Sequence, residues 1–278
     1  MNKLQTLLAI AVGGALVNFA LPASAQSAAP GYATVIRVKG EASYSLDGGA
    51  HKFALVPGKF LEEHATIYTS DDALVDVVLG KAIDLPQATW TPKRISLSVD
   101  SPVRGLVSYR PSAEQNVIRV DSNSELVIDK LTTTSSGADT VSDTELDLKK
   151  GSIFASVKKL SPAAQYLVKT PSGIAGVRGT QFDISLNPDG TIKSVSVYRS
   201  LGDEGLTLAV TSAGGATQTY TVKAGETWEP GSPNPVPLTP QLRALLQQAF
   251  AALRTPYYQV VSYDYDRTQY RESGDFGF

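Results

Sequence analysis

Apolar and polar residues alternate in short runs along most of this chain, and a period of two predicts β-strands rather than helices. In residues 181–186, for example, Phe182, Ile184 and Leu186 alternate with polar residues, as in a strand buried on one face. Residues 73–79 are almost continuously apolar, which indicates a strand buried on both faces. The pattern predicts an all-β domain over residues 33–230. A twisted β-solenoid and a sandwich both fit this pattern.

Three segments within this region call for separate interpretations. Residues 81–115 contain four prolines and predict an insertion with long loops and a short strand at 95–99. Residues 132–144 are rich in Thr, Ser, Gly and Asp and predict an exposed loop. Residues 145–150 and 152–157 alternate on either side of Lys150-Gly151, which predicts a β-hairpin.

The pattern changes after residue 230. Residues 231–238 are rich in proline and predict a linker. Residues 239–255 have leucines at helical spacing, with Thr239 as the N-cap and Pro240 in the first turn, and predict one C-terminal helix. Residues 256–278 form a Tyr- and Asp-rich tail, which we expect to be loosely held.

Residues 1–25 have the pattern of a secretory signal peptide. Lys3 gives a positive start, residues 7–21 are apolar, and Ala23-Ser24-Ala25 supplies the small residues that a signal peptidase requires. A membrane anchor is the alternative, but glycines, an asparagine and a proline interrupt this apolar run. We therefore expect cleavage after Ala25 and export to the periplasm or beyond, with no membrane span in the mature chain.

The amino-acid composition limits which kinds of function the protein can have. The formal net charge is −2, which argues against nucleic acid as a partner, because such proteins carry a basic surface. The chain has no cysteine, so neither disulfides nor thiolate chemistry contributes. A mature chain of this length can bury one large core without covalent cross-links.

The residues that enzymes and metal sites use do not form a recognisable pattern. His51 and His64 are the only histidines and are not spaced as metal ligands. Acidic residues gather at 139–147 and at 264–266, but without the order of a calcium loop. We predict no catalytic residue, cofactor or metal. A hydrolase that uses an unmarked pair of carboxylates stays open as an alternative.

One glycine-rich segment stands out, at residues 170–186. Gly173, Gly176 and Gly179 recur every three residues, and Arg178 precedes the last of them. Such glycines permit a positive φ or a close backbone approach, so the segment predicts a tight bend before a strand. Arg178 could bind an anion or a partner. We favour a structural role, in which its donors tie neighbouring carbonyls together.

This segment resembles the FecR domain family. The residues that carry the resemblance are Gly176, Arg178, Gly179, Thr180 and Phe182, in the run Ala-Gly-Val-Arg-Gly-Thr followed by Phe at the head of a strand. Pieces at 40–69, 146–155 and 224–226 are similar to other parts of that family, so the resemblance spans residues 33–230. It implies an exported, twisted all-β domain.

The name-giving members of that family are inner-membrane regulators that sense a receptor in the periplasm and control a cytoplasmic sigma factor. This chain departs from them, because we expect neither a cytoplasmic N-terminal domain nor a retained membrane helix. The resemblance therefore implies the fold and a protein-binding role in the cell envelope, with an unknown envelope protein or polymer as partner. The alternative is a carbohydrate- or surface-polymer-binding module, for which the tyrosines between 257 and 270 are candidate contacts.

Overall fold

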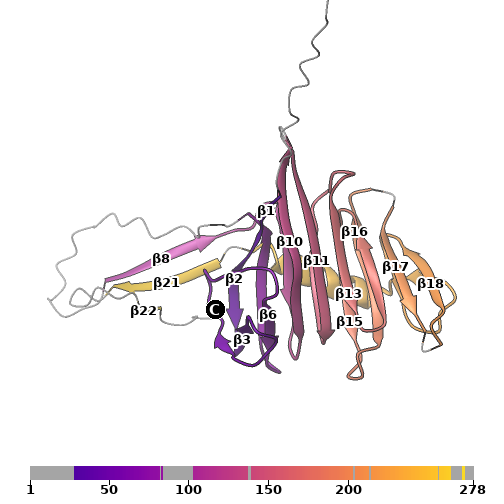
Figure 1. Cartoon of the computed structure of the whole chain (residues 1–278), viewed down its shortest axis with the longest axis horizontal. Coiled ribbons are helices and arrows are strands. Elements are labelled where there is room, and N and C mark those ends of the chain that lie inside the picture. The colour runs from indigo at the N-terminus through magenta and orange to yellow at the C-terminus, as the bar shows by residue number, and fades with distance from the viewer. Residues whose placement is uncertain are drawn as a thin grey trace, which may run out of the picture.

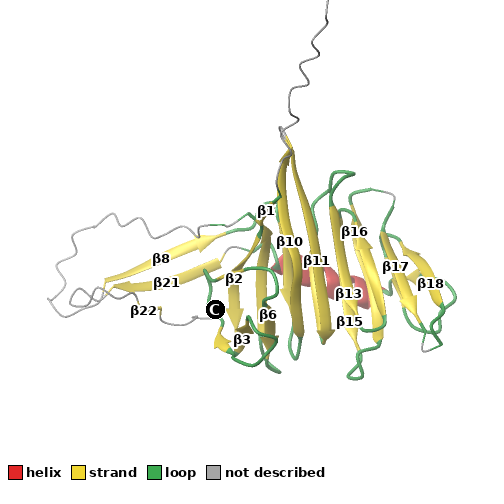
Figure 2. Ribbon diagram, viewed as in Figure 1, coloured by secondary structure: helices red, strands yellow, loops and turns green. Residues whose placement is uncertain are grey.

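The computed structural model of the protein describes residues 28–81, 83, 103–136, 139–202, 204–212, 214–255, 257–263 and 271–272. The prediction of an all-β fold with one C-terminal helix is confirmed for these residues. Two large sheets lie face to face, and the helix packs behind the second sheet (Figures 1 and 2).

The first sheet, sheet A, has ten strands, with β1 (Ala29–Pro30) attached beside β10. The others follow in the order β18 (Thr217–Val222), β17 (Leu206–Thr211), β14 (Gly173–Val177), β13 (Gln165–Thr170), β11 (Asp139–Lys150), β10 (Glu125–Ser136), β6 (Thr66–Thr69), β3 (Ala42–Ser45) and β4 (Phe53–Ala54).

The second sheet, sheet B, has nine strands. They follow in the order β20 (Val236–Pro237), β19 (Glu226–Trp228), β16 (Ile192–Ser200), β15 (Thr180–Leu186), β12 (Ser152–Ser156), β9 (Asn116–Val120), β7 (Leu74–Gly80), β2 (Tyr32–Lys39) and β5 (Phe60–Leu61). Both sheets thus advance along the sequence in the same direction, because the chain passes repeatedly from one sheet to the other.

These crossings overturn the predicted hairpin at Lys150-Gly151. The chain does turn at Gly151, but β11 lies in sheet A beside β10 and β13, whereas β12 lies in sheet B between β9 and β15. The turn is therefore a corner between two sheets. A Cβ at Gly151, whose φ is +81°, would lie 2.1 Å from Ser124 Oγ, so only glycine fits there.

The core fills the space between the two sheets. It consists of the inward side chains of alternating positions, which explains the period of two in the sequence. Phe182 and Tyr166 are the largest fully buried side chains. Residues 74–79 are also buried on their other face, as predicted for a strand covered on both sides.

Helix α1 (Pro240–Ala252) covers the outer face of sheet B. Thr239 caps it, because its Oγ1 accepts a hydrogen bond from the Leu242 N–H (3.2 Å). Leu246 and Phe250 pack in a second apolar cluster with side chains from β2, β7, β9 and β16. Among the described residues, no helix has the length and apolar character needed to cross a membrane.

The segment 132–144 is not the exposed loop that its composition predicts. Residues 125–136 and 139–150 pair as a long antiparallel hairpin, with Thr133 opposite Ser142 and Leu131 opposite Thr144. Thr133, Ser142 and Thr144 are buried. The prediction is wrong because these small polar side chains take inward positions that leucine and isoleucine occupy nearer the base of the hairpin.

A third, smaller sheet joins two segments that are far apart in the sequence. β8 (Val103–Tyr109) pairs antiparallel with β21 (Tyr257–Tyr263), which also pairs with β22 (Arg271–Glu272). Figure 1 shows β8 and β21 projecting away from the two large sheets. The predicted tail thus contains a strand at 257–263. The short strand predicted at 95–99 lies outside the described residues.

Three charged residues and one phenylalanine occupy paired positions in neighbouring strands on the outer face of sheet B. Strand register places Arg37, Asp76, Arg119 and Phe154 side by side in neighbouring strands. Asp76 is fully buried, and Arg119 donates to its carboxylate from Nε (2.7 Å) and Nη2 (2.9 Å). Burial alone would lower the pKa of Arg119, but its hydrogen bonds to Asp76 raise it, so the guanidinium stays charged.

We expect Asp76→Ala to lower the free energy of unfolding by about 3–5 kcal/mol, because the change leaves the Arg119 guanidinium buried without its partner. Denaturant unfolding measures this loss. Asp143→Ala is the matched control: it removes the half-exposed Lys130–Asp143 pair (3.3 Å) and should cost less than about 1 kcal/mol. Equal, small losses in both variants would contradict the interpretation.

Candidate functional site

The glycine–arginine segment occupies a corner between the two sheets. Gly176 lies within β14 of sheet A, Arg178 and Gly179 form the bend, and Thr180 begins β15 of sheet B. Phe182 is fully buried in the core. The segment therefore carries the chain from sheet A to sheet B. Arg178, Gly179 and Thr180 make the crossing, and Phe182 belongs to the core.

The glycines of the segment are not equivalent. Gly179 has a φ of +68°, and a Cβ there would lie 3.1 Å from the Lys159 Cα. Gly176 has no positive φ, and a Cβ there would meet nothing closer than 3.7 Å. The backbone thus requires glycine at 179 but not at 176.

Arg178 is exposed at this corner. Its Nη2 donates to the Pro162 carbonyl (2.9 Å), which ties the bend to the loop before β13. Among the described residues it makes no ion pair. The contact agrees with the structural role that we favour, and the rest of the guanidinium faces solvent.

Asp183 follows Phe182 on β15 and points to the opposite face, toward the side of sheet B that helix α1 covers. Its carboxyl is buried, and Oδ1 has no hydrogen-bond partner among the described residues. Burial raises the pKa of Asp183 to about 7, although the Ser196 hydroxyl acts in the opposite direction. Alternation along β15 predicts that residue 183 points outward into solvent, so the burial of this acid cannot be predicted from the sequence.

No described side chain forms an ion pair with Asp183, because Phe154 lies between this acid and Arg119. Phe154 stands opposite both Arg119 and Asp183 in its two neighbouring strands, so an aromatic ring separates the acid from the guanidinium. Phe154 also packs against Phe250 of the helix (centroids 6.2 Å apart).

Ser45, Asp47 and His51 gather in one turn, but their order does not suit nucleophilic catalysis. Asp47 lies between the other two: Ser45 Oγ donates to one carboxylate oxygen (2.7 Å) and His51 Nδ1 lies 2.6 Å from the other. A serine nucleophile needs histidine as its direct partner. The His51 backbone N–H and the Ser45 hydroxyl lower the pKa of Asp47, as expected for a carboxylate that caps a turn.

Three of the acidic residues considered as calcium ligands, Asp143, Glu145 and Asp147, form ion pairs with lysines. Lys169 contacts Glu145 (2.6 Å) and Asp129 (3.3 Å), Lys130 contacts Asp143, and Lys149 contacts Asp147. Within the described ranges, no group of three or more acidic or histidine side chains could hold a metal ion. The acids at 264–266 lie outside those ranges.

Four exposed apolar side chains belong to residues 46–60, at the edge of the two sheets where β4 and β5 are the last strands. Leu46, Phe53, Val56 and Phe60 are 37–59% exposed there. We call this surface, made by these four residues with Tyr32 and Tyr44, the aromatic end.

Two lysines extend the aromatic end with positive charge. Phe53 packs against Tyr44 (centroids 5.6 Å apart) and Phe60 against Tyr32 (6.1 Å). Lys59 lies over the Tyr44 ring (4.9 Å) and Lys52 over the Tyr68 ring (3.7 Å). Sequence reasoning missed this surface, because exposure depends on which strands end each sheet. The concentration of aromatic residues around 44–60 is the signal that could have suggested it.

Comparison with known proteins supports the predicted resemblance over part of the chain. The family described as "FecR protein" matches residues 111–200, which contain β9 to β16 and the whole glycine–arginine segment. The resemblance is therefore confirmed for this segment, whereas the similar pieces at 40–69 and 224–226 lie outside the match. No curated protein matches the sequence.

Two crystal structures of a candidate anti-sigma factor from Parabacteroides distasonis ATCC 8503 are similar to the chain. The structure at 1.65 Å shares 12% identity with a TM-score of 0.33, and the alignment covers 55% of this chain and 63% of that one. The structure at 2.50 Å shares 11% identity with a TM-score of 0.31, covering 48% and 60%. The chain thus spans less than two thirds of either structure.

We expect Gly179→Ala to lower the free energy of unfolding by about 1–3 kcal/mol, because alanine must adopt a positive φ beside the Lys159 backbone. Gly176→Ala is the matched control from the same segment and should change stability by less than about 0.5 kcal/mol. Chemical denaturation of the two variants measures the difference. If both lose the same stability, the bend does not depend on its left-handed residue.

We expect Asp183→Asn to change how stability depends on pH. The native state keeps the Asp183 proton up to about pH 7, whereas the unfolded chain releases it near pH 3.8, the ordinary pKa of an aspartate side chain. Wild-type stability therefore falls as pH rises between these values, and the asparagine variant lacks this loss. The advantage of the variant should grow by on the order of 3 kcal/mol between pH 4 and pH 8. Thermal or denaturant unfolding across this pH range tests it, and parallel curves would refute the burial of a protonated acid.

Proposed function

We propose that this protein, whose residues 111–200 match the FecR family, is an exported, non-enzymatic binding or scaffolding protein of the cell envelope. It would act by contact with another protein. The observation that carries this proposal is the aromatic end, where apolar and aromatic side chains gather in solvent at the edge of both sheets.

The chemistry of the aromatic end suits a protein partner. Scattered exposed apolar residues are normal on a soluble domain, but a group of them rimmed by charge is typical of an interaction surface. Phenylalanine and tyrosine are enriched in the buried centres of protein interfaces. Lys52 and Lys59 rest on tyrosine rings, so they can contact acidic groups of a partner while the rings cover its apolar surface.

The described side chains favour binding over catalysis. Ser45, Asp47 and His51 meet in the order of a capped turn, and the acids of sheet A are neutralised by lysines. The buried acid Asp183 lies beneath a helix, where a substrate would first have to displace packed aromatic side chains.

The N-terminal pattern supports the proposed location. A signal peptide cleaved after Ala25 would deliver the β domain to the periplasm or beyond, and a partner would then be an envelope protein. Expression of the whole chain in a Gram-negative host should give a mature protein that begins at Gln26, which N-terminal sequencing of the periplasmic fraction can verify.

Site-specific photocrosslinking tests the aromatic end directly. A photoreactive residue at Phe53 or Phe60 should give one discrete crosslinked species in the native envelope, whereas one at Leu245, an exposed residue on the helix, should give none. Phe53→Ser combined with Phe60→Ser should abolish the species formed from Val56. The melting temperature should change by no more than a few degrees, since both rings are partly exposed. Crosslinking that is equal at Leu245, or that survives the double change, would contradict the proposal.

The polymer-binding alternative makes a different prediction. The protein would bind to a glycan array. This binding would be lost when the tyrosines of 257–263 are replaced and kept when Phe53 and Phe60 are replaced, a result that would establish polymer binding instead.

A further inference from the structure

The four strands that end the two large sheets differ in length and composition. β4, β5 and β20 have two residues each, and β20 contains Pro237. β18 ends sheet A on the side away from the aromatic end and has six residues, Thr-Gln-Thr-Tyr-Thr-Val, without a proline or a charge. Natural proteins keep open edges short or place proline or charge on them, because an open edge can pair with another chain. β18 has none of these protections.

The hydrogen bonds around β17 determine which backbone groups of β18 are free. At the turn between the two strands, the Ser212 N–H donates to the Ala216 carbonyl (2.9 Å). The N–H of the preceding residue, Thr211, points the other way and donates to the Ser172 carbonyl beside β14 (2.9 Å). Residues of an antiparallel pair alternate in this way, so every second residue bonds to the partner strand and those between face the opposite side.

Strand register extends this alternation along β18. Thr217 lies opposite Thr211, so this pair exchanges no hydrogen bonds, and the same holds for the pairs that contain Thr219 and Thr221. The N–H and C=O groups of these three threonines therefore point to the open edge. Among the described strands, β18 has no neighbour on that side.

Sheet B extends past β18 at this end. Tyr220 of β18 packs on Trp228 of β19 across the core (ring centroids 4.9 Å apart), and β20 lies on the far side of β19. Pro237 of β20 lies opposite Glu226, two residues before Trp228, so it is on the inner face of sheet B. Pro237 is nevertheless exposed, because no described strand of sheet A covers it. One further strand beside β18 would cover this residue.

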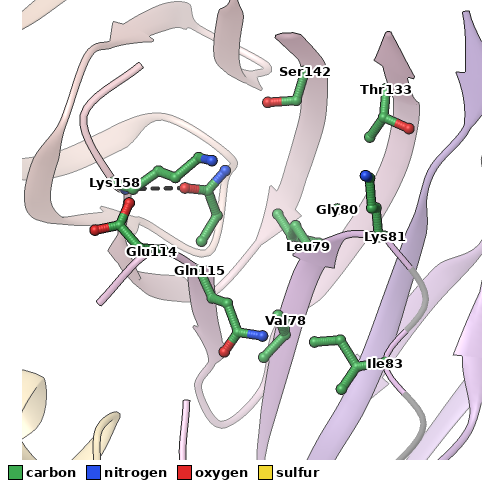
Figure 3. A pocket seen from close by; sticks show the side chains of 11 residues that line it. Val78, Leu79, Gly80, Lys81, Ile83, Glu114, Gln115, Thr133, Ser142 and Lys158 are labelled. Carbon is green, nitrogen blue, oxygen red and sulfur yellow. Dashed lines mark hydrogen bonds between the residues drawn. The ribbon is translucent and has the colours of Figure 1, made fainter. Parts of the chain in front are cut away.

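The pocket beside the end of β7 differs from this edge in character. Charged side chains are among those that surround it, including Lys81, Glu114 and Lys158 (Figure 3). Water solvates such groups well, so the pocket needs no covering strand. The edge at β18 instead offers uncharged side chains and free backbone groups, which only another backbone can pair with in series.

We propose that β18 binds an extended, uncharged segment of another protein by strand addition, antiparallel to β18, with the inward side chains of the added strand over Pro237. Main-chain hydrogen bonds to Thr217, Thr219 and Thr221 would provide the affinity, and alternate side chains the selectivity. β-branched side chains suit this position, because they pack well beside a strand. The site lies at the opposite end of the sheets from the aromatic end and does not depend on it.

A second copy of this chain fits the edge less well. Two β18 strands that paired about a two-fold axis would bring the two copies of sheet B against each other, because β20 already extends past β18 in each. A single extended segment meets no such obstacle. The edge therefore suits a strand from a partner rather than a second folded copy.

Titration of the purified chain with the peptide acetyl-Lys-Thr-Val-Thr-Val-Thr-Lys-amide, followed by NMR, tests the proposal. We expect saturable binding. Amide hydrogen exchange at Thr219 and Thr221 should be fast in the free protein and slow in the complex, whereas Tyr220, which bonds to β17, should be protected in both.

Two methylated peptides test the geometry of pairing without any change to the protein. With valines facing Pro237, the threonine N–H groups of the peptide point to β18 and the valine N–H groups point away. N-methylation of the threonines should weaken binding about tenfold or more, whereas N-methylation of the valines should change it by less than about twofold.

Thr219→Pro tests the protein side of the ladder. Proline removes an N–H from the open edge but none that bonds to β17, so the variant should fold and bind the peptide about tenfold more weakly or worse. Thr219→Ala is the matched control, because it changes the side chain and keeps the backbone donor. It should bind within about twofold of the parent.

Four results would overturn the proposal: no saturable binding, equal binding of the two methylated peptides, full affinity in folded Thr219→Pro, or protection of Thr219 and Thr221 in concentrated protein without peptide. The last would mean that a second copy occupies the edge. Phe53→Ser combined with Phe60→Ser should leave peptide binding unchanged, so failure at β18 is distinguishable from failure at the aromatic end.

Discussion

The fold depends on how the chain turns from one sheet into the other. The shortest crossings, from β2 to β3, β11 to β12 and β14 to β15, take only one or two residues, and a left-handed backbone makes this possible. Glycines with positive φ stand at five corners between the sheets: Gly40, Gly151, Gly179, Gly205 and Gly225. At Gly151 and Gly205 a Cβ would also come within 2.4 Å of another atom. The glycine–arginine segment is one instance of this rule. It is prominent because Arg178 ties its corner to the Pro162 carbonyl, and because the next inward residue, Phe182, fills the core.

The outer face of sheet B carries polar residues, and helix α1 covers part of that face. Residues that a two-layer fold would leave in water lie beneath helix α1 or beside it. Asp76 and Arg119 tolerate burial because they form a hydrogen-bonded ion pair, in which each charge is balanced by the other. Asp183 is kept from that pair by the Phe154 ring and accommodates burial through its pKa instead. The same row of strand positions therefore contains an ion pair and a buried acid that has no counter-charge among the described residues. The helix that creates this difference also hides it from solvent.

Local signals in the sequence were sufficient for the elements but not for their partners. Strand alternation, the Thr239 cap and the bend at Gly179 could all be predicted, because each depends on residues close together in the chain. Lys150-Gly151 suits a hairpin and a corner equally well, and only the strands on either side decide between them. The polar residues of 132–144 form long strands because their register continues a pairing begun by Leu126 and Leu148. The burial of Asp183 and the exposure of Phe53 are set by a distant helix and by the edge of a sheet. No residue near Asp183 in the sequence indicates its burial, whereas the aromatic residues around 44–60 are a local signal for the exposed surface.

The pairing of β8 with β21 has a consequence for the order of assembly. Tyr109 lies opposite Tyr257, so strands β9 to β20 and helix α1 separate these two strands in the sequence. Among the described strands, β8 has only this neighbour. During synthesis from the N-terminus, β8 therefore has no partner strand until β21 has been made. Closing so long a loop is entropically costly and slow unless the intervening body has already folded and brought the ends together. The small sheet can therefore form only after the strands that lie between β8 and β21 in the sequence.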